Sequence, residues 1–316
     1  MYKMDAAKRD ALTAFLTRQL TAYDMRLNEP LSGQTEWPMV ISMRTNVGLG
    51  DQATAFFRQG WTANGGIATP GISWAGRRAN GTIPTVGITD EMVTHPLRPW
   101  AQQIDYTVFE LEAAQALGRS ISDEKMRALN KKYQIDMDLI VATGDTQLGF
   151  TGLYNSAEVT AASATNGKWA SAQPLDIVED INNAAKAIYT ASGYSHAPDT
   201  LILPPDQYAV IATTPMSTTI PDITIFDWLK RRSFGAVKNG RELTILDSRY
   251  LPGLGAGNTD RAVLYTKGED MVRIAGTPLT TMPVEVHDYT YGVTVYGVIG
   301  EVEIVYPTTV GYVDGI

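Results

Sequence analysis

The sequence has no cysteine, only three histidines, and no lysine between Lys8 and Lys125. Without cysteine the chain has no disulfide, thiolate nucleophile or cysteine metal ligand, which fits a reducing cytosol. The histidines are His95, His196 and His287, and their spacing indicates neither a hydrolytic triad nor a zinc site. We therefore expect no cofactor and no bound metal.

Motifs for catalysis and phosphate binding are missing as well. The sequence contains no HExxH, no GxSxG and no phosphate loop ending in Gly-Lys-Ser or Gly-Lys-Thr. Residues 253–257, GLGAG, resemble a dinucleotide loop, but no helical pattern follows them, so an ordinary loop is the better interpretation. Adjacent carboxylates such as Asp136 and Asp138 would not share one helix face. We expect no catalytic residues and no enzymatic activity.

Long apolar runs are also absent. The longest are a few residues, whereas a membrane-spanning helix needs about 20. Near the N-terminus, Lys3, Asp5, Lys8 and Arg9 interrupt the region where a secretory signal has its apolar core. We expect neither an export signal nor a membrane anchor.

The composition is that of a folded protein with an acidic balance. Of the 316 residues, 44% are hydrophobic and 19% are charged, and the net charge is −8. The chain can therefore bury a core, and it is not a basic nucleic-acid-binding protein as a whole. Any contact with DNA needs a local basic patch, for which Arg9, Arg18 and Arg26 are candidates.

Helical and strand patterns are mixed along the chain. Apolar residues recur every three or four positions in residues 10–27, 122–143 and 174–188, which predicts amphipathic helices. Alternation in residues 293–306 predicts a long strand, and the apolar run 200–203 predicts a short one. These elements together predict an α+β fold.

Residues 59–89 form a glycine-rich segment with little charge. They contain seven glycines, two tryptophans, Trp61 and Trp74, and two charged residues before Asp90, Arg77 and Arg78. Short alternating stretches predict a β-hairpin, but an isolated hairpin of this length is marginally stable in water. We expect the segment to lie on another surface, either its own domain or a second subunit, with these four side chains as contacts.

Residues 144–155, GDTQLGFTGLYN, follow the predicted helix 122–143. Glycines could wrap an anion here, but no lysine and no following helix N-terminus support a phosphate site. We interpret the segment as a connector between two lobes, in which Gly144, Gly149 and Gly152 provide a hinge.

Two motifs, together with the order of these segments, resemble a known family. The motifs are the connector ending in Gly-Leu-Tyr-Asn and the run DTLILPPDQY at residues 199–208. Over nearly the whole chain, the pattern resembles the major capsid proteins of tailed phages, which have the Hong Kong 97-type fold. This resemblance implies an N-terminal arm, an extended β-hairpin loop, a peripheral domain with a long spine helix, and an axial domain.

The resemblance assigns these parts to residue ranges. The arm would be residues 1–44 and the extended loop residues 45–97. The peripheral domain would combine residues 98–155 with 281–316, and the axial domain would be residues 156–280. The spine helix would be residues 122–143.

The implied function is structural. Copies of the chain would form hexamers and pentamers of an icosahedral shell around double-stranded DNA, in a virion assembled in the host cytoplasm. Scaffold, portal and decoration proteins are further partners that the resemblance allows, and we expect a separate scaffold protein or none. Because no lysine lies between Lys8 and Lys125, the lysine–asparagine crosslink of some relatives is unavailable to the extended loop. The alternatives are an encapsulin-like nanocompartment with enzyme cargo and a soluble α/β enzyme.

Overall fold

The structure is a computed structural model that describes residues 33–63, 86–116, 121–165, 167–217 and 222–316. The chain divides into two units, Met1–Gln34 and Thr35–Ile316. All that follows concerns the second unit. The helix expected in residues 10–27 lies outside the described residues.

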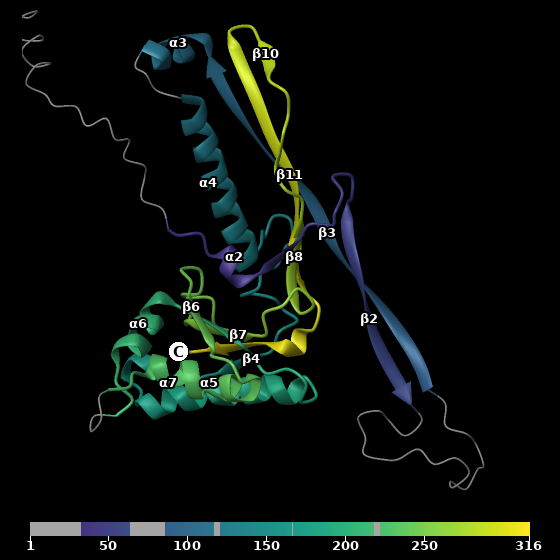
Figure 1. Cartoon of the computed structure of the whole chain (residues 1–316). Helices are drawn as coiled ribbons and strands as arrows, with labels where there is room; N and C mark the ends of the chain where they lie inside the picture. Colours follow the sequence, from purple (N-terminus) through teal and green to yellow (C-terminus); the bar gives the residue numbers. More distant parts are fainter. Residues whose placement is uncertain (1–32, 64–85, 117–120, 166, 218–221) are drawn as a thin grey trace, which may run out of the picture. The chain divides into compact units, whose positions relative to one another are not determined.

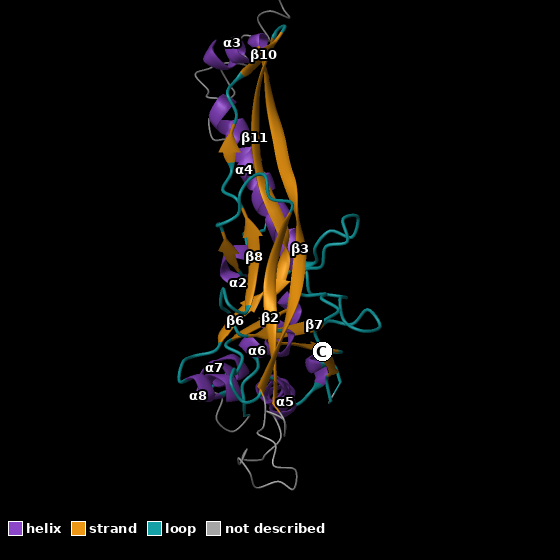
Figure 2. Ribbon diagram, turned by 90° about the vertical axis from the view of Figure 1, so that its right-hand side faces the viewer, coloured by secondary structure: helices purple, strands orange, loops and turns teal. Residues whose placement is uncertain are grey.

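A seven-stranded sheet is built around two long antiparallel strands. β3 (Val86–Thr107) pairs with β11 (Thr290–Ile304) from Thr107 opposite Thr290 to Leu97 opposite Gly300. The two strands lie side by side in both ribbon views (Figures 1 and 2). The alternating sequence predicted a long strand at β11, and this is confirmed. The other strands of this sheet are β1 (Ser42–Arg44), β2 (Ala53–Ala63), β8 (Val272–Gly276), β9 (Thr280–Thr281) and β10 (Glu285–His287).

The helix predicted at residues 122–143 is α4, Ile121–Ala142, and it follows the shorter helix α3, Val108–Ala116. Its apolar stripe packs on the long sheet, where Leu129, Tyr133 and Met137 are buried. Trp100 of β3 meets the Tyr133 ring edge-on at 5.1 Å, which joins the helix to the sheet.

A second, five-stranded sheet carries helices. Its order is β4-β12-β7-β5-β6, and the strands are β4 (Ala161–Ser163), β5 (Thr200–Leu203), β6 (Thr244–Asp247), β7 (Arg261–Tyr265) and β12 (Val310–Asp314). The helices are α5 (Pro174–Ala191), α6 (Pro205–Thr213), α7 (Ile225–Arg232) and α8 (Phe234–Asn239), with single turns at Trp169–Ser171 and Pro307–Thr309. The predicted amphipathic face of α5 is buried from Ile177 to Ile188.

Strand pairing differs from the predicted division at three places. β12 pairs with β7 and β4, so residues 310–314 belong to the second sheet and not with residues 98–155. β8 and β9, which were placed in the axial range, pair with β11 of the long sheet. β1, placed in the arm, pairs in parallel with β8. In the described residues the chain passes from one sheet to the other after β3, after β7 and after β11, which is one crossing more than the continuous ranges allow.

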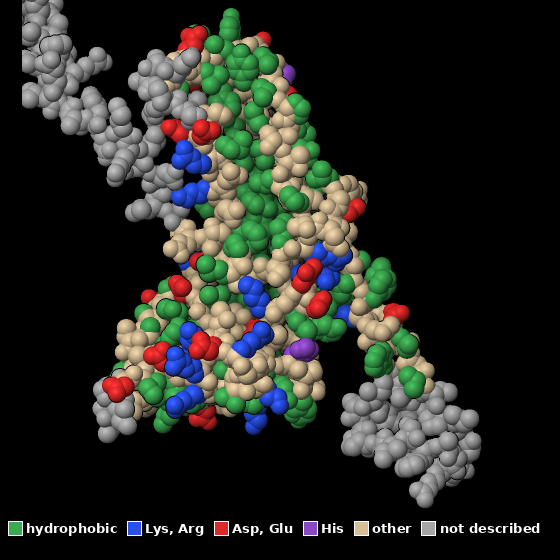
Figure 3. Space-filling view, in the orientation of Figure 1, with side chains coloured by type: hydrophobic (Ala, Val, Ile, Leu, Met, Phe, Trp, Pro, Cys, Tyr) green, Lys and Arg blue, Asp and Glu red, His purple; other side chains and the backbone are tan. Residues whose placement is uncertain are grey.

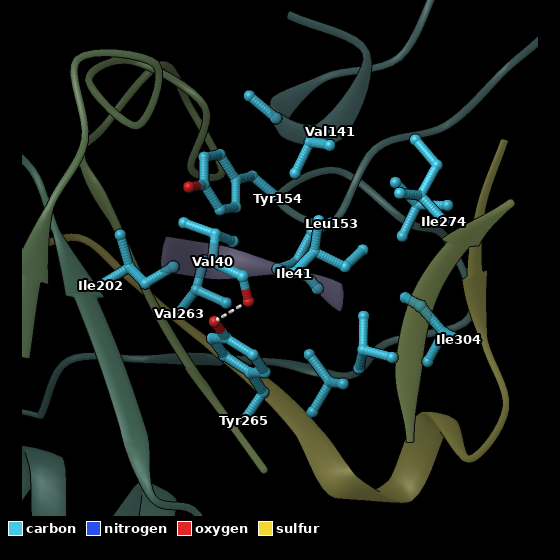
Figure 4. Packing of buried hydrophobic residues seen from close by; sticks show 14 of the residues in the cluster. Val40, Ile41, Val141, Leu153, Tyr154, Ile202, Val263, Tyr265, Ile274 and Ile304 are labelled. Atoms are coloured by element: carbon cyan, nitrogen blue, oxygen red, sulfur yellow. Dashed lines mark hydrogen bonds between the residues drawn. The ribbon is translucent and has the colours of Figure 1, made fainter. Parts of the chain in front are cut away.

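One core joins the two sheets. Val40, the last residue of the short helix α2 (Trp37–Val40), and Ile41 after it pack between side chains from both sheets and from α4 (Figure 4). The Tyr265 hydroxyl donates to the Val40 carbonyl oxygen at 2.6 Å. Residues 36–44 therefore act as a strap across the two sheets.

Charged side chains hold the beginning of this strap. Asp138 of α4 accepts hydrogen bonds from the backbone N–H groups of Glu36 and Trp37, both at 2.9 Å. Arg249 donates to Asp138 at 3.1 Å, and the Ser248 hydroxyl donates to the Glu36 carboxylate at 2.5 Å. Two carboxylates thus share one arginine.

This arrangement makes stability depend on the charge of Glu36. Burial raises the pKa of Glu36, and the bonds from Ser248 and Arg249 compensate for only part of that effect. A carboxyl group with a raised pKa contributes stability that is fully present below its unfolded pKa and is lost as the pH rises through its folded pKa. We expect Glu36→Gln to remove this loss, so that the variant unfolds at a higher urea concentration than the parent at pH 7 and not at pH 4. Glu269→Gln, at an exposed position, controls for the lost charge, and an equal gain there would contradict the prediction.

Candidate assembly surfaces

The β2–β3 hairpin has one apolar face. The register places Phe57 opposite Met92 and Trp61 opposite Ile88. Because successive side chains on a strand point to opposite sides, these four lie on the same face. They are 60–68% exposed, with Phe57 at 68% and Met92 at 60%. Large apolar side chains are usually buried, but the described residues leave these four largely exposed. The face is therefore suited to contact another molecule.

A second apolar patch lies at the far end of the long sheet. Phe109 of α3 and Tyr289, in the turn between β10 and β11, are 70% and 71% exposed, and their ring centroids are 6.3 Å apart. Val284 and Val286, which precede this turn in the sequence, are also exposed. Figure 3 shows hydrophobic side chains gathered over this end, where α3, β10 and β11 lie. In the described part of the unit, exposed apolar side chains therefore gather at the β2–β3 hairpin and at the end of the long sheet next to α3.

The opposite face of the hairpin is attached to the long sheet at its base. Glu303 of β11 is fully buried, receives Arg273 Nε at 2.6 Å, and accepts a hydrogen bond from the Thr54 hydroxyl. Phe56 is buried beneath two guanidinium groups, those of Arg58 at 5.5 Å and Arg273 at 5.6 Å from the ring centroid. A buried carboxylate needs such partners, because an unpaired one would be costly.

His95 and Glu301 form the other half of this base. His95 Nδ1 lies 3.2 Å from the Glu301 carboxylate, and its ring stacks on Phe56 at 5.7 Å. Thr151 donates both its N–H and its hydroxyl to Glu301, each at 2.8 Å. Burial opposes ionisation of Glu301, but the hydrogen bonds from His95 and Thr151 outweigh it and lower its pKa. The carboxylate therefore stays charged and ties the hairpin base to the connector after α4.

The connector itself is tightly packed. Gly144 and Gly149 have φ values of 73° and 74°, and a Cβ on Gly152 would lie 2.4 Å from the carbonyl group of Ala142. Asn155 fastens the turn, since its side chain accepts from Gly152 N and donates to the Thr143 carbonyl, both at 2.8 Å. The connection between the lobes is thus a compact turn, and its function as a hinge stays a prediction.

A groove of about 730 Å³ lies beside this connector. Its two carboxylates are already engaged: Asp136 accepts from Trp100 Nε1 at 3.1 Å and from Lys132, and Asp145 accepts from Gln147 N at 2.9 Å. Among the described residues, no group of three or more acidic or histidine side chains is arranged to hold a metal ion. None of the described helices is long and apolar enough to cross a membrane.

Of the predicted contact residues, Trp61 lies on the exposed hairpin face, where 64% of it is accessible. Trp74, Arg77 and Arg78 lie outside the described residues. Sequence reasoning missed Phe57 and Met92, which the hairpin register places on the same face as Trp61. The alternation within residues 53–63 was the available signal, but two adjacent phenylalanines made the outward face ambiguous.

Solved structures that are similar to this chain include phage capsids and the capsid of a GTA particle. The chain superimposes on the capsid protein of Myoviridae phage XM1 with a TM-score of 0.77 at 14% identity, covering 95% of this chain and 98% of that chain. The capsid of an empty GTA particle gives 0.61 at 12% identity, with 99% of each chain covered. Mycobacterium phage Che8 gives 0.60 at 13% identity, with 93% and 96% covered. The α+β, Hong Kong 97-type capsid fold is confirmed.

The family follows from the sequence match. Residues 73–316 match the model of the major capsid protein family, and the chain belongs to that family. It is a structural protein that forms a capsid shell with copies of itself, and its place is the virion. The encapsulin-like alternative is not favoured by these matches. No curated protein sequence matches the chain.

Proposed function

We propose that this chain forms hexamers and pentamers of an icosahedral shell that encloses double-stranded DNA, and that it does so without catalysing a reaction. The observation that carries the proposal is the apolar face of the β2–β3 hairpin, which holds Phe57, Trp61, Ile88 and Met92 at 60% exposure or more. Such a face on an elongated hairpin is suited to burial against a neighbouring copy. Trp74, Arg77 and Arg78 are further contact candidates in the same loop.

Shell closure also explains why no single contact needs to be strong. Each copy in a closed shell meets several neighbours at once, so contacts of a few kcal/mol act together. The net charge of −8 suits an enclosure for DNA, because DNA binding requires phosphate neutralisation by Lys and Arg. We propose assembly in the host cytoplasm, with portal, decoration and separate scaffold proteins as partners.

The test is to produce the full chain alone and with the other proteins of its particle, and to examine it by light scattering and negative-stain microscopy. Closed particles containing nuclease-protected double-stranded DNA would support the proposal. Particles that enclose an enzyme and no DNA would favour a nanocompartment. A stable species of 34.4 kDa under all conditions would contradict shell formation.

A further inference from the structure

The backbone hydrogen bonds between strands do not by themselves fix the direction of the β2–β3 hairpin relative to β11. β3 pairs with β11 up to Leu97 opposite Gly300, and it pairs with β2 from Pro96 opposite Ala53 onwards. Among the described strands, β2 pairs only with β3. The hairpin is therefore connected to the sheet through the single continuous strand β3, which leaves its tilt relative to β11 to be fixed by side chains.

Of the side chains that attach β2 to the rest of the sheet, Arg58 lies farther along the strand from the base of the hairpin than Thr54 and Phe56. Its Nε donates to the Val305 carbonyl oxygen at 3.0 Å, and its Nη2 donates to the Ile304 carbonyl oxygen at 2.9 Å. The same Nη2 lies 2.9 Å from the Glu158 carboxylate. The planar guanidinium thus bridges β2 to the end of β11, beyond the last residue that β3 pairs with.

Two further attachments act on the same face of β2. Thr54 bonds to Glu303, and Phe56 packs under Arg273, which itself pairs with Glu303. Thr54, Phe56 and Arg58 occupy alternate positions, so all three point to the side opposite Phe57 and Trp61. One face of β2 therefore attaches the hairpin to the rest of the long sheet, and the other face carries the exposed apolar side chains.

We propose that Arg58 is a positioning residue for shell assembly, because it fixes the direction of the hairpin and thereby the angle at which neighbouring copies meet. This inference rests on the proposed function. From Thr54 to Ala63 the strand reaches ~30 Å, so a tilt of ~10° at the base moves the far end by ~5 Å, about one strand spacing. A displacement of that size changes the contacts of the apolar face. Whether repeated contacts close into a shell depends on the rotation between copies.

Because Arg58 lies near the surface, its replacement should change the direction of the hairpin and leave the folding of the subunit largely unaffected. Its side chain is 24% exposed, and that of Glu158 is 49% exposed. An ion pair this open to water contributes little to stability, and water can replace the guanidinium at the two carbonyl groups. The Phe56 ring, which the Arg58 guanidinium partly covers, keeps the guanidinium of Arg273 over it. Arg58 takes no part in the ion pair between the fully buried Glu303 and Arg273, whose side chain is 13% exposed, so we expect that pair to remain when Arg58 is replaced.

The experiment compares Arg58→Ala and Arg58→Lys with the parent under conditions that give parental shells. For Arg58→Ala we expect a melting temperature of the unassembled subunit close to that of the parent, with a spread of particle diameters wider by about twofold or more, including open sheets. Arg58→Lys cannot reach both carbonyl groups as a fork, so it should give an intermediate spread. The measurements are differential scanning calorimetry and particle diameters from negative-stain images.

Two variants serve as controls. Glu158→Gln removes the ion pair and keeps both carbonyl bonds of Arg58, and Arg127→Ala removes one exposed positive charge from α4. Both should give parental diameters. Uniform parental shells from Arg58→Ala would overturn the inference, as would a subunit that no longer folds in both Arg58 variants. A parent that forms no particle would instead contradict the proposed function, so the two failures are distinguishable.

Discussion

Replacing Gly152 with alanine is expected to destabilise the subunit by ~3 kcal/mol or more, at the upper end of the effect of overpacking. An added Cβ would lie 2.4 Å from the carbonyl carbon and oxygen of Ala142 and 2.5 Å from the Thr143 nitrogen. These are backbone atoms at the end of α4, and they cannot shift like a flexible side chain. Urea denaturation of the unassembled subunit measures the loss.

The surroundings of Gly152 explain why relaxation is limited. The next two residues bond back to the helix, with Leu153 N to the Val141 oxygen at 2.8 Å and Tyr154 N to the Ala142 oxygen at 3.0 Å. Both side chains are buried in the core that joins the sheets. Moving the connector away from the helix would break these bonds and open that core.

Gly149→Ala is the matched comparison. Gly149 has a φ of 74°, but a Cβ there would meet no atom within 4 Å. Its cost is that of the left-handed conformation alone, ~1 kcal/mol. Equal losses from the Gly149 and Gly152 variants would contradict the packing argument, because they would show that backbone conformation accounts for both.

The elements that could be predicted from the sequence are those whose one-sided burial repeats over many residues. Helix α4 was expected at residues 122–143 and is found at Ile121–Ala142, since a helix packed on one side needs an apolar residue every three or four positions. The long strand β11 was recognised for the corresponding reason, with a period of two.

The sheet to which a strand belongs could not be predicted in the same way. β12 was not predicted as a separate strand, and its partners β7 and β4 lie about 50 and 150 positions away in the sequence and carry no complementary pattern. Pairing is decided by tertiary packing, here by the return of the chain after the turn Pro307–Thr309. The ranges inferred for the capsid domains therefore stay predictions, while the sheet membership of β1, β8 and β12 is established by the structure.

The assembly surface was found in part for a similar reason. The small number of charged residues in 59–89 identified this segment, and Trp61 within it, as a predicted contact surface. The outward position of Phe57 depends on which face of β2 lies on β8 and β11, and that choice is made by Arg58 and Glu303. Their partners include carbonyl groups 246 and 247 positions away, which no local pattern reveals.

Removing the aromatic groups from the exposed hairpin face is expected to weaken assembly without unfolding the subunit. Phe57 and Trp61 are 68% and 64% exposed in the described unit, so the double variant Phe57→Ala and Trp61→Ala should change the free energy of unfolding by no more than ~0.5 kcal/mol. Burying each large apolar side chain at a contact is worth ~1.5–3 kcal/mol. Because every 1.4 kcal/mol is about a factor of ten in affinity, the concentration needed for assembly should rise at least about tenfold.

Light scattering as a function of protein concentration measures this threshold, and thermal denaturation of the unassembled subunit measures the stability. The matched control is Thr89→Ala, since Thr89 is exposed on the same hairpin but lies on the opposite face from Trp61. A parental assembly threshold in the double variant would show that this face meets no neighbour. If the free energy of unfolding of the subunit fell by as much as the free energy of assembly, the two rings would be shown to contribute to folding. With Thr89→Ala unchanged, a loss confined to assembly would locate the contact on the face of Phe57 and Trp61, because the two faces share one backbone and differ in the side chains they present.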